Sequence, residues 1–246
     1  MSQYDIMQAA CRADEVSSSI FHAMNVEVHG FAHSPFCIAI ETVLGSLEVP
    51  FERREVSVAD RSSVLRLTGG ACYEVPVLVH RDEVVFESGA DSQDVARYID
   101  STFAMGSLFP ERLKGIHDLV VRYLEHEVEG VTFRAYDPFH VDSVENVAER
   151  GMIVRHKERR FGRGCVERWK EERKQILCES AELLRPFEEM LSENGYLFGD
   201  RPVYADFLLG GILGNLLFGG HNRLPADLGR LAALPQRLQA FRDGGA

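Results

Sequence analysis

The spacing of hydrophobic residues changes near residue 100 and divides the chain into two parts. In the first part, segments that alternate apolar and polar residues, as strands do, are interleaved with segments whose apolar residues fall on one helical face. Strands are predicted at 26–28, 51–56, 75–79 and 84–86, and helices at 35–47, 64–67 and 95–99. The predicted order is β-α-β-α-β-β-α, with a hairpin joining the last two strands.

From Pro110 onward, apolar residues recur at helical spacing only, as in the segment 207–217. We therefore expect the second half of the chain to be all helical. The predicted organisation is an N-terminal extension over 1–24, an α/β domain over 25–101 and an all-helical domain over 108–246.

The charge of the chain limits the partners it can attract. A formal net charge of −11 over 246 residues gives no overall positive field, so we expect no nucleic-acid and no membrane partner. Residues 1–24 have neither a cationic start nor a continuous apolar stretch, which argues against a signal peptide and makes a cytoplasmic location the default expectation. Five scattered cysteines lack disulfide or metal-type spacing and predict reduced thiols and no metal site. They are Cys11, Cys37, Cys72, Cys165 and Cys178.

The segment Ser34-Pro35-Phe36-Cys37 lies where the first predicted strand passes into the first helix. Ser34 is expected at or near the N-cap, with Pro35 in the first turn. Its hydroxyl has two possible roles: an ordinary cap that accepts a backbone N–H, or a donor to an anion, such as a thiolate, at the helix N-terminus. Cys37 has the position of a small buried apolar residue.

Two further segments offer ligand contacts. Val75-Pro76 begins a predicted strand, where a cis bond would present the backbone of Val75 to a ligand and a trans proline would mark an edge strand. An acidic residue followed by serine then occurs twice before the next helix, as Glu87-Ser88 and as Asp91-Ser92. Either pair suits a charged amino acid, and the alternative is a helix capping box.

A basic stretch over 155–173 has six Arg and Lys residues before Trp169, interrupted by two glutamates. We expect a solvated face and a loop here, with a functional patch as the alternative.

Together these segments resemble the glutathione transferase family. The resemblance rests on the order of Ser-Pro-Phe-Cys, Val-Pro-Val-Leu, a hairpin, an acidic residue with serine, and a helix ending Arg-Tyr-Ile-Asp, over roughly 25–100. In the second half, 196–202 and 205–207 are similar to the family's helix-capping segment. The resemblance implies a thioredoxin-like domain that binds glutathione, an all-helical C-terminal domain, and a hydrophobic electrophile site between them.

The resemblance also implies roles for single residues. Ser34 matches the serine that holds the glutathione sulfur, and Val75 matches the residue before a cis-proline, Pro76. Arg61 matches by spacing a basic residue that approaches the glycine carboxylate of glutathione.

For the γ-glutamyl end of glutathione, the resemblance leaves two registers. Counted from Pro76, the acidic-serine pair is Glu87-Ser88, and counted back from Tyr98 it is Asp91-Ser92. We favour Asp91-Ser92, because the packing of the following helix is in register with Ser92. A second departure is Val203, where the family usually has a Ser or Thr cap, and half of this cap is expected to be missing at a cost of about 1 kcal/mol.

The function implied is a detoxifying, homodimeric transferase in which Ser34 activates the thiol of glutathione, its co-substrate, for attack on a small apolar electrophile. Two alternatives remain: a glutathione-binding or regulatory module without turnover, and a glutathione-dependent thiol-disulfide reductase. Members of the latter class have cysteine where this chain has Ser34. Candidate residues for the electrophile wall, each also compatible with the core, are Tyr123, Phe133, Tyr136, Phe139 and Trp169.

Overall fold

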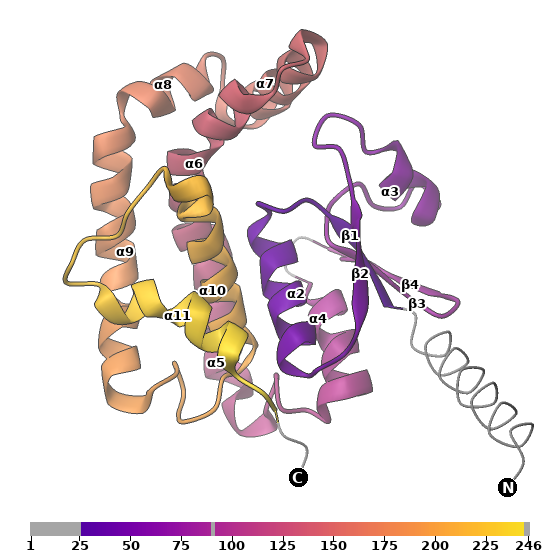
Figure 1. Ribbon diagram of the computed structural model, residues 1–246, viewed down its shortest axis with the longest axis vertical. Coiled ribbons are helices and arrows are strands. Elements are labelled where there is room, and N and C mark those ends of the chain that lie inside the picture. The colour runs from indigo at the N-terminus through magenta and orange to yellow at the C-terminus, as the bar shows by residue number, and fades with distance from the viewer. Residues whose placement is uncertain (1–25, 90–91, 244–246) are drawn as a thin grey trace, which may run out of the picture.

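The computed structural model describes residues 26–89 and 92–243. A small half built on a four-stranded sheet lies beside a larger helical half (Figure 1). This arrangement confirms the expected fold class, a thioredoxin-like α/β domain followed by a helical region. The expected extension over 1–24 and the candidate Asp91 lie outside the described residues.

The sheet consists of β1 (Val26–Gly30), β2 (Phe51–Glu55), β3 (Val77–His80) and β4 (Glu83–Val85), in the order β2-β1-β3-β4. β1 is parallel to β2 and antiparallel to β3, and Val28 of β1 lies opposite both Arg53 and Leu78. β3 and β4 form the expected hairpin. The exposed edge strand β2 is largely charged, which opposes pairing with another sheet.

The helices of this half are α2 (Pro35–Ser46), α3 (Ser62–Leu67) and α4 (Asp94–Ile99), and α4 continues into a π-helical turn, η1 (Asp100–Ala104). α2 begins where the sequence predicts, because Ser34 caps it and Pro35 occupies its first turn. The apolar face of α2, with Ile40, Val43 and Leu44, is buried in the core.

The helical half begins with a continuous run of four segments: η2 (Glu111–Leu113), α5 (Lys114–Tyr123), η3 (Leu124–Val128) and α6 (Glu129–Ser143). It continues with α7 (Val147–Phe161), α8 (Cys165–Glu171), α9 (Arg173–Asn194), α10 (Tyr204–Leu216), η4 (Phe218–Gly220) and α11 (Gly229–Ala240). Within the described ranges, no helix has both the length and the apolar character needed to cross a membrane.

α10 joins the two halves through contact with the first turns of α2. A Cβ atom at Gly211 would lie 2.1 Å from the carbonyl oxygen of Pro35 and 3.0 Å from the amide nitrogen of Ala39. Only glycine allows this contact, since real Cβ atoms do not approach other heavy atoms so closely. One turn later, the side-chain amide of Asn215 donates to the carbonyl oxygen of His33 at 2.6 Å. The residue before Ser34 is therefore held by the helical half.

The start of α10 compensates for the missing cap at Val203. The carboxylate of Asp206 accepts from the backbone N–H groups of Val203 and Leu197 at 3.0 and 2.8 Å. The N–H of Ala205 donates to Nε2 of His117 on α5 at 3.1 Å. Burial lowers the pKa of His117 to about 4, so the ring is neutral and this nitrogen can accept. A residue from another helix thus supplies the acceptor that Val203 lacks.

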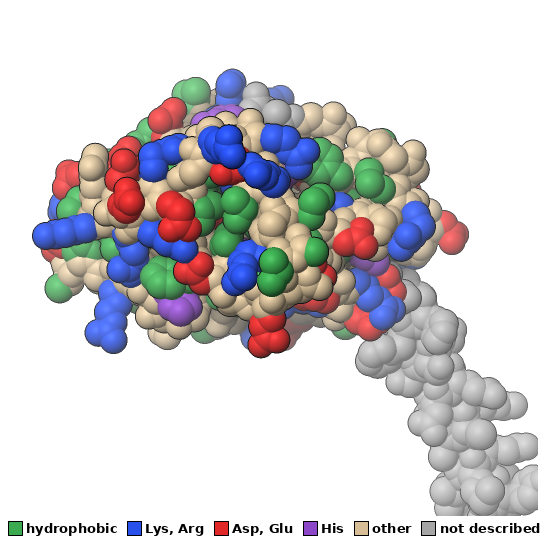
Figure 2. Space-filling view, turned by 90° about the horizontal axis from the view of Figure 1, so that it is seen from above, with side chains coloured by type: hydrophobic (Ala, Val, Ile, Leu, Met, Phe, Trp, Pro, Cys, Tyr) green, Lys and Arg blue, Asp and Glu red, His purple; other side chains and the backbone are tan. Residues whose placement is uncertain are grey.

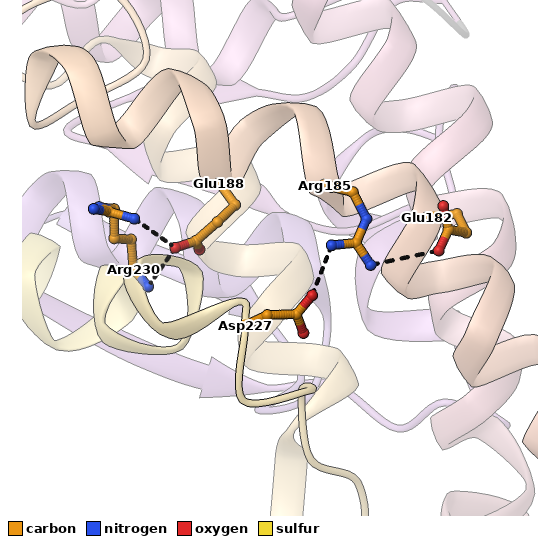
Figure 3. Close-up of polar contacts among 5 residues, drawn as sticks. All are labelled: Glu182, Arg185, Glu188, Asp227 and Arg230. Atoms are coloured by element: carbon orange, nitrogen blue, oxygen red, sulfur yellow. Dashed lines mark hydrogen bonds and ion pairs between the residues drawn. The ribbon is translucent and has the colours of Figure 1, made fainter.

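A buried glutamate fixes the start of α11 in a similar way. The carboxylate of Glu188 on α9 accepts from the backbone N–H of Arg230 at 3.0 Å and from the Arg230 guanidinium at 3.2 Å (Figure 3). It also accepts from the backbone N–H of Leu231 at 2.9 Å. Nearby, the exposed Arg185 pairs with Asp227 at 2.7 Å (Figure 3). The carboxylate of Glu188 is buried and that of Asp227 is exposed, so the loss of stability on removing them should differ.

We predict that Glu188→Ala lowers the free energy of unfolding by about 2–4 kcal/mol, because it leaves the N–H groups at the start of α11 without an acceptor. Asp227→Ala is expected to cost less than about 1 kcal/mol, as is typical of an exposed ion pair. Urea denaturation of both variants measures the two values. Equal losses would contradict the assignment of Glu188 as the cap of α11.

Candidate functional site

A cavity of about 460 Å³ lies beside the start of α2, between the two halves of the molecule. The α/β half contributes residues from the loops before α2 and β3 and from the loop after β4. The helical half contributes one face of η3 and α6, together with residues of α7 and α10. The cavity therefore requires both halves.

Ser34 lines this cavity although its residue surface is only 3% exposed. Its Oγ accepts the N–H of Cys37 at 3.3 Å, so the capping role is present in the structure. Burial raises the pKa of the Cys37 thiol to about 11, with a smaller opposing effect from the hydrogen bond to Ser34. Cys37 is thus a buried, protonated thiol. At this helix start, the hydroxyl of Ser34 is the polar side-chain group on the cavity wall.

His33, next to Ser34, lies within an aromatic group at the cavity wall. Its ring centroid is 4.7 Å from that of Phe31 and 4.1 Å from that of His140 on α6. Burial lowers the pKa of His33 to about 3, so the ring carries no charge at neutral pH. His33 gives the wall an uncharged, polarisable surface beside the serine.

The loop before β3 carries the cis peptide bond Val75–Pro76, and both residues line the cavity. β3 itself begins at Val77, two residues later than the alternation of the sequence predicts. Because proline has no N–H to donate to a strand ladder, Val75 and Pro76 remain in the loop and beside the cavity.

The loop after β4 brings together residues that the sequence had placed in two alternative registers. The hydroxyl of Ser92 donates to the carboxylate of Glu87 at 2.6 Å, and the N–H groups of Asp94 and Val95 donate to the same carboxylate at 2.9 and 3.3 Å. Glu87 and Ser92 both line the cavity. Ser88 is exposed, lies outside the cavity lining, and donates its N–H to Asp94.

This loop is also tied to the helical half. The side-chain amide of Gln93 is buried and donates to the carboxylate of Glu125 on η3 at 2.7 Å. Burial raises the pKa of Glu87, against the effect of its hydrogen bonds. One end of the cavity is consequently built from hydrogen-bonded carboxyl and hydroxyl groups.

Arg61 lies at another part of the cavity, at the start of α3. Its guanidinium lies over the ring of Phe31, 4.8 Å from the centroid, and its Nε donates to the Val58 carbonyl at 3.3 Å. Burial lowers the pKa of Arg61, and no carboxylate among the described residues forms an ion pair with it. A half-buried cation of this kind favours an anionic ligand.

The wall from the helical half is more polar than the sequence suggested. On α6, Glu129, Phe133, Asp137 and His140 face the cavity at helical spacing. Asp137 forms an ion pair with Lys157 of α7. Burial raises the pKa of Glu129 to about 7, so this carboxyl is partly protonated at neutral pH.

Of the five expected wall residues, only Phe133 lines the cavity. Tyr136 and Trp169 are buried in the core, Phe139 stacks on His221 at 4.3 Å, and Tyr123 is exposed on α5. The charged residues of this wall were not predicted, because the spacing of apolar residues along α6 does not report charged positions. Among the residues that the structure describes, no group of His, Cys, Asp and Glu has the arrangement of a metal site.

Sequence comparison identifies proteins that are similar to this chain. Residues 28–107 match the family model described as the glutathione S-transferase N-terminal domain. Glutathione S-transferase U6 from Arabidopsis thaliana is 23% identical over 188 residues, which cover 76% of this chain and 70% of the relative. Glutathione S-transferase U1 from the same plant is 31% identical over 87 residues, covering 35% of this chain and 37% of the relative.

Structural comparison gives the same fold. The glutathione transferase GSTFuA3 from Phanerochaete chrysosporium has a TM-score of 0.73 at 18% identity and covers 90% of this chain and 99% of its own. Glutaredoxin 2 from Salmonella typhimurium, in complex with glutathione, has a TM-score of 0.65 at 20% identity and covers 87% of this chain and 95% of its own. At these identities the solved structures establish the fold. Residues 28–107 match the glutathione S-transferase N-terminal domain, and the chain is similar in sequence to a glutathione transferase over 76% of its length.

Proposed function

We propose that this protein is a glutathione transferase that binds glutathione in the α/β part of the cavity and activates its thiol for attack on a small electrophile. The observation that carries the proposal is the position of Ser34, at the start of α2 and on the cavity wall. One solved relative in fold, from Ceriporiopsis subvermispora, contains bound glutathione, at a TM-score of 0.69 and 17% identity. The expected cytoplasmic location and detoxifying role belong to this proposal.

The groups around the cavity complement the three parts of glutathione. Ser34 suits the sulfur, the backbone of Val75 suits the cysteinyl peptide groups, and Arg61 suits the glycine carboxylate. Ser92 and Glu87 suit the γ-glutamyl group, since the Ser92 hydroxyl can rotate from Glu87 to donate to its carboxylate, and the Glu87 carboxylate matches its ammonium.

Activation of the glutathione thiol follows from the position of Ser34 at the N-terminus of α2. A free thiol has a pKa near 8.5 and is only a few per cent ionised at neutral pH. The Ser34 hydroxyl donates to the sulfur, and the N-terminus of α2 favours its negative charge. The thiol loses its proton to water, and the thiolate then attacks the electrophile. The protein supplies orientation and charge stabilisation, and glutathione supplies the nucleophile.

The two alternatives are less well supported. Disulfide reduction needs a nucleophilic thiol, whereas position 34 carries a hydroxyl and Cys37 is buried with a pKa of about 11. A binding module without turnover would be compatible with a half-missing cap at Val203, but His117 and Asp206 satisfy the start of α10.

The first prediction of the proposed function concerns Ser34. Ser34→Ala should lower kcat/KM about a hundredfold, as removal of a donor to a catalytic anion does, and should raise the pKa of bound glutathione toward about 8.5. The loss of the cap should cost about 1 kcal/mol of stability, so unfolding is measured beside turnover and thiolate absorbance.

Ser34→Cys is the matched variant. A cysteine at this helix start should have a lowered pKa and form a mixed disulfide with glutathione, so that conjugation declines while disulfide-reducing activity appears. Wild-type titration and turnover in Ser34→Ala, together with no mixed disulfide in Ser34→Cys, would leave Ser34 as a cap only.

The second prediction concerns the γ-glutamyl contact. Ser92→Ala should weaken glutathione binding about tenfold, or roughly 1.4 kcal/mol, because the Ser92 hydroxyl is at the cavity. Ser88→Ala should leave the dissociation constant unchanged, because Ser88 is exposed outside the cavity lining. Titration calorimetry measures both. The reverse pattern would assign the contact to Glu87-Ser88.

We further propose a two-fold homodimer that buries an apolar stripe of α5. Ile116, Leu119 and Tyr123 lie on one face of this helix and are 52%, 65% and 38% exposed. Exposed apolar residues gathered on one helix face are typical of an association surface, and a second copy related by a two-fold axis would cover this stripe.

The third prediction tests this interface by light scattering at micromolar concentration. The wild type should have twice the chain mass of 27.7 kDa, and Leu119→Arg should have the monomer mass. Val147→Arg, at an exposed apolar residue of α7, is the control and should remain dimeric. A monomeric wild type would rule out the dimer.

A further inference from the structure

The basic stretch over 155–173, which the sequence left open between a solvated face and a functional patch, begins in the last turns of α7. His156, Lys157, Arg159 and Arg160 line the cavity. Figure 2 looks down on the end of the molecule where α7 lies in Figure 1, and Lys and Arg side chains gather near the middle of this face. Part of the stretch therefore belongs to the cavity mouth.

Two bases of this region that lie away from the cavity, Arg155 and Lys170, have acidic partners, whereas Arg168 donates to the backbone carbonyls of Arg163 and Phe161. Arg155 pairs with Glu158 at 2.6 Å, and Lys170 pairs with Asp142 at 2.8 Å and with Glu167 at 3.1 Å. Arg159 and Arg160, by contrast, line the cavity and form no ion pair with any described residue. The guanidinium of Arg160 lies over the ring of Phe161, 5.4 Å from its centroid.

Basic side chains from both halves of the molecule lie close enough to His156 to lower its pKa. The pKa of His156 is lowered by burial and by the charges of Lys157, Arg159, Arg61 and Arg160. Of these, Lys157 has a partner in Asp137. The other acidic groups of the cavity include Glu74 and the partly protonated Glu129. The cavity thus has a cationic rim at α7.

An apolar floor lies next to this rim. Phe133 is 8% exposed and contacts the Lys157 ammonium, 5.0 Å from the ring centroid, and Ile153 of α7 is 4% exposed. Phe36, directly after Ser34 and Pro35, also lines the cavity. A ligand that fits both features has an apolar or aromatic body and a negative group at one end.

We propose that the electrophilic substrate is an aromatic or apolar carboxylate, whose anionic group is bound by Arg159 and Arg160 while its body lies over Phe133 toward Ser34. This inference rests on the proposed function and narrows its substrate class. The local positive rim contrasts with the net charge of −11 of the whole chain. Arginine suits the role, because its planar donors match a carboxylate.

The test uses two electrophiles that differ in one charge, a chloronitrobenzoate and the corresponding chloronitrobenzamide. In each, the thiolate of glutathione attacks the carbon that bears chlorine, a C–S bond forms, the C–Cl bond breaks and chloride leaves. The wild type should prefer the benzoate about tenfold in kcat/KM, or about 1.4 kcal/mol. In the double variant Arg159→Gln/Arg160→Gln this ratio should fall to about one.

Arg155→Gln is the matched control, because Arg155 lies on the same helix and pairs with Glu158. It should keep the wild-type ratio. A ratio near one in the wild type would overturn the inference. So would a double variant that raises the KM for glutathione and leaves the ratio intact, since the arginines would then bind the glycine carboxylate of glutathione.

A binding measurement separates this inference from the proposed function. The chain has one tryptophan, Trp169, whose ring centroid is 5.4 Å from that of Phe133, so its fluorescence should respond to ligands on the cavity floor. Unreactive nitrobenzoate should quench it with about tenfold higher affinity than nitrobenzamide. Preferential binding without turnover of either chloro compound would support the anionic site and refute the transferase, whereas equal affinities would refute the anionic site.

Discussion

The contact between Gly211 of α10 and the first turns of α2 sets the geometry of the whole molecule. At 2.1 Å from the Pro35 carbonyl, a Cβ atom has no room, so the backbones of the two halves touch directly behind Ser34. Asn215, one turn along α10, then holds the carbonyl of His33. The close contact between α10 and α2 positions Ser34 and the aromatic group around His33. It also positions the cavity wall on α6, because α10 packs against α6 as well.

Much of the α/β half could be predicted from the sequence, because its signals are local. Alternation predicted the strands, Ser34 and Pro35 marked the start of α2, and the short polar connection between the last two strands predicted the hairpin. The loop after β4 could not be predicted, because its path depends on hydrogen bonds that join Glu87 to Ser92 and Gln93 to Glu125. Counting along the chain therefore presented Glu87 and Ser92 as alternatives, although they lie together.

The cavity wall of the helical half was harder to predict for a related reason. α6 packs its apolar residues into the core on one side and turns Glu129, Asp137 and His140 to the cavity on the other. Hydrophobic spacing reports the first side only. Likewise, the basic stretch has a similar composition on its solvated and cavity-facing sides. The structure separates its two parts, because Arg159 and Arg160 line the cavity whereas Arg155 and Lys170 lie away from it in ion pairs.

The cap that His117 provides has a consequence for how the chain folds. A serine or threonine at position 203 would stabilise the start of α10 through contacts a few residues apart, whereas His117 is 88 positions away from its donor, Ala205. The first turn of the central helix is therefore completed only after α5 has docked. Formation of α10 becomes cooperative with the assembly of the helical half, and a fragment that contains α10 without α5 is expected to start this helix poorly.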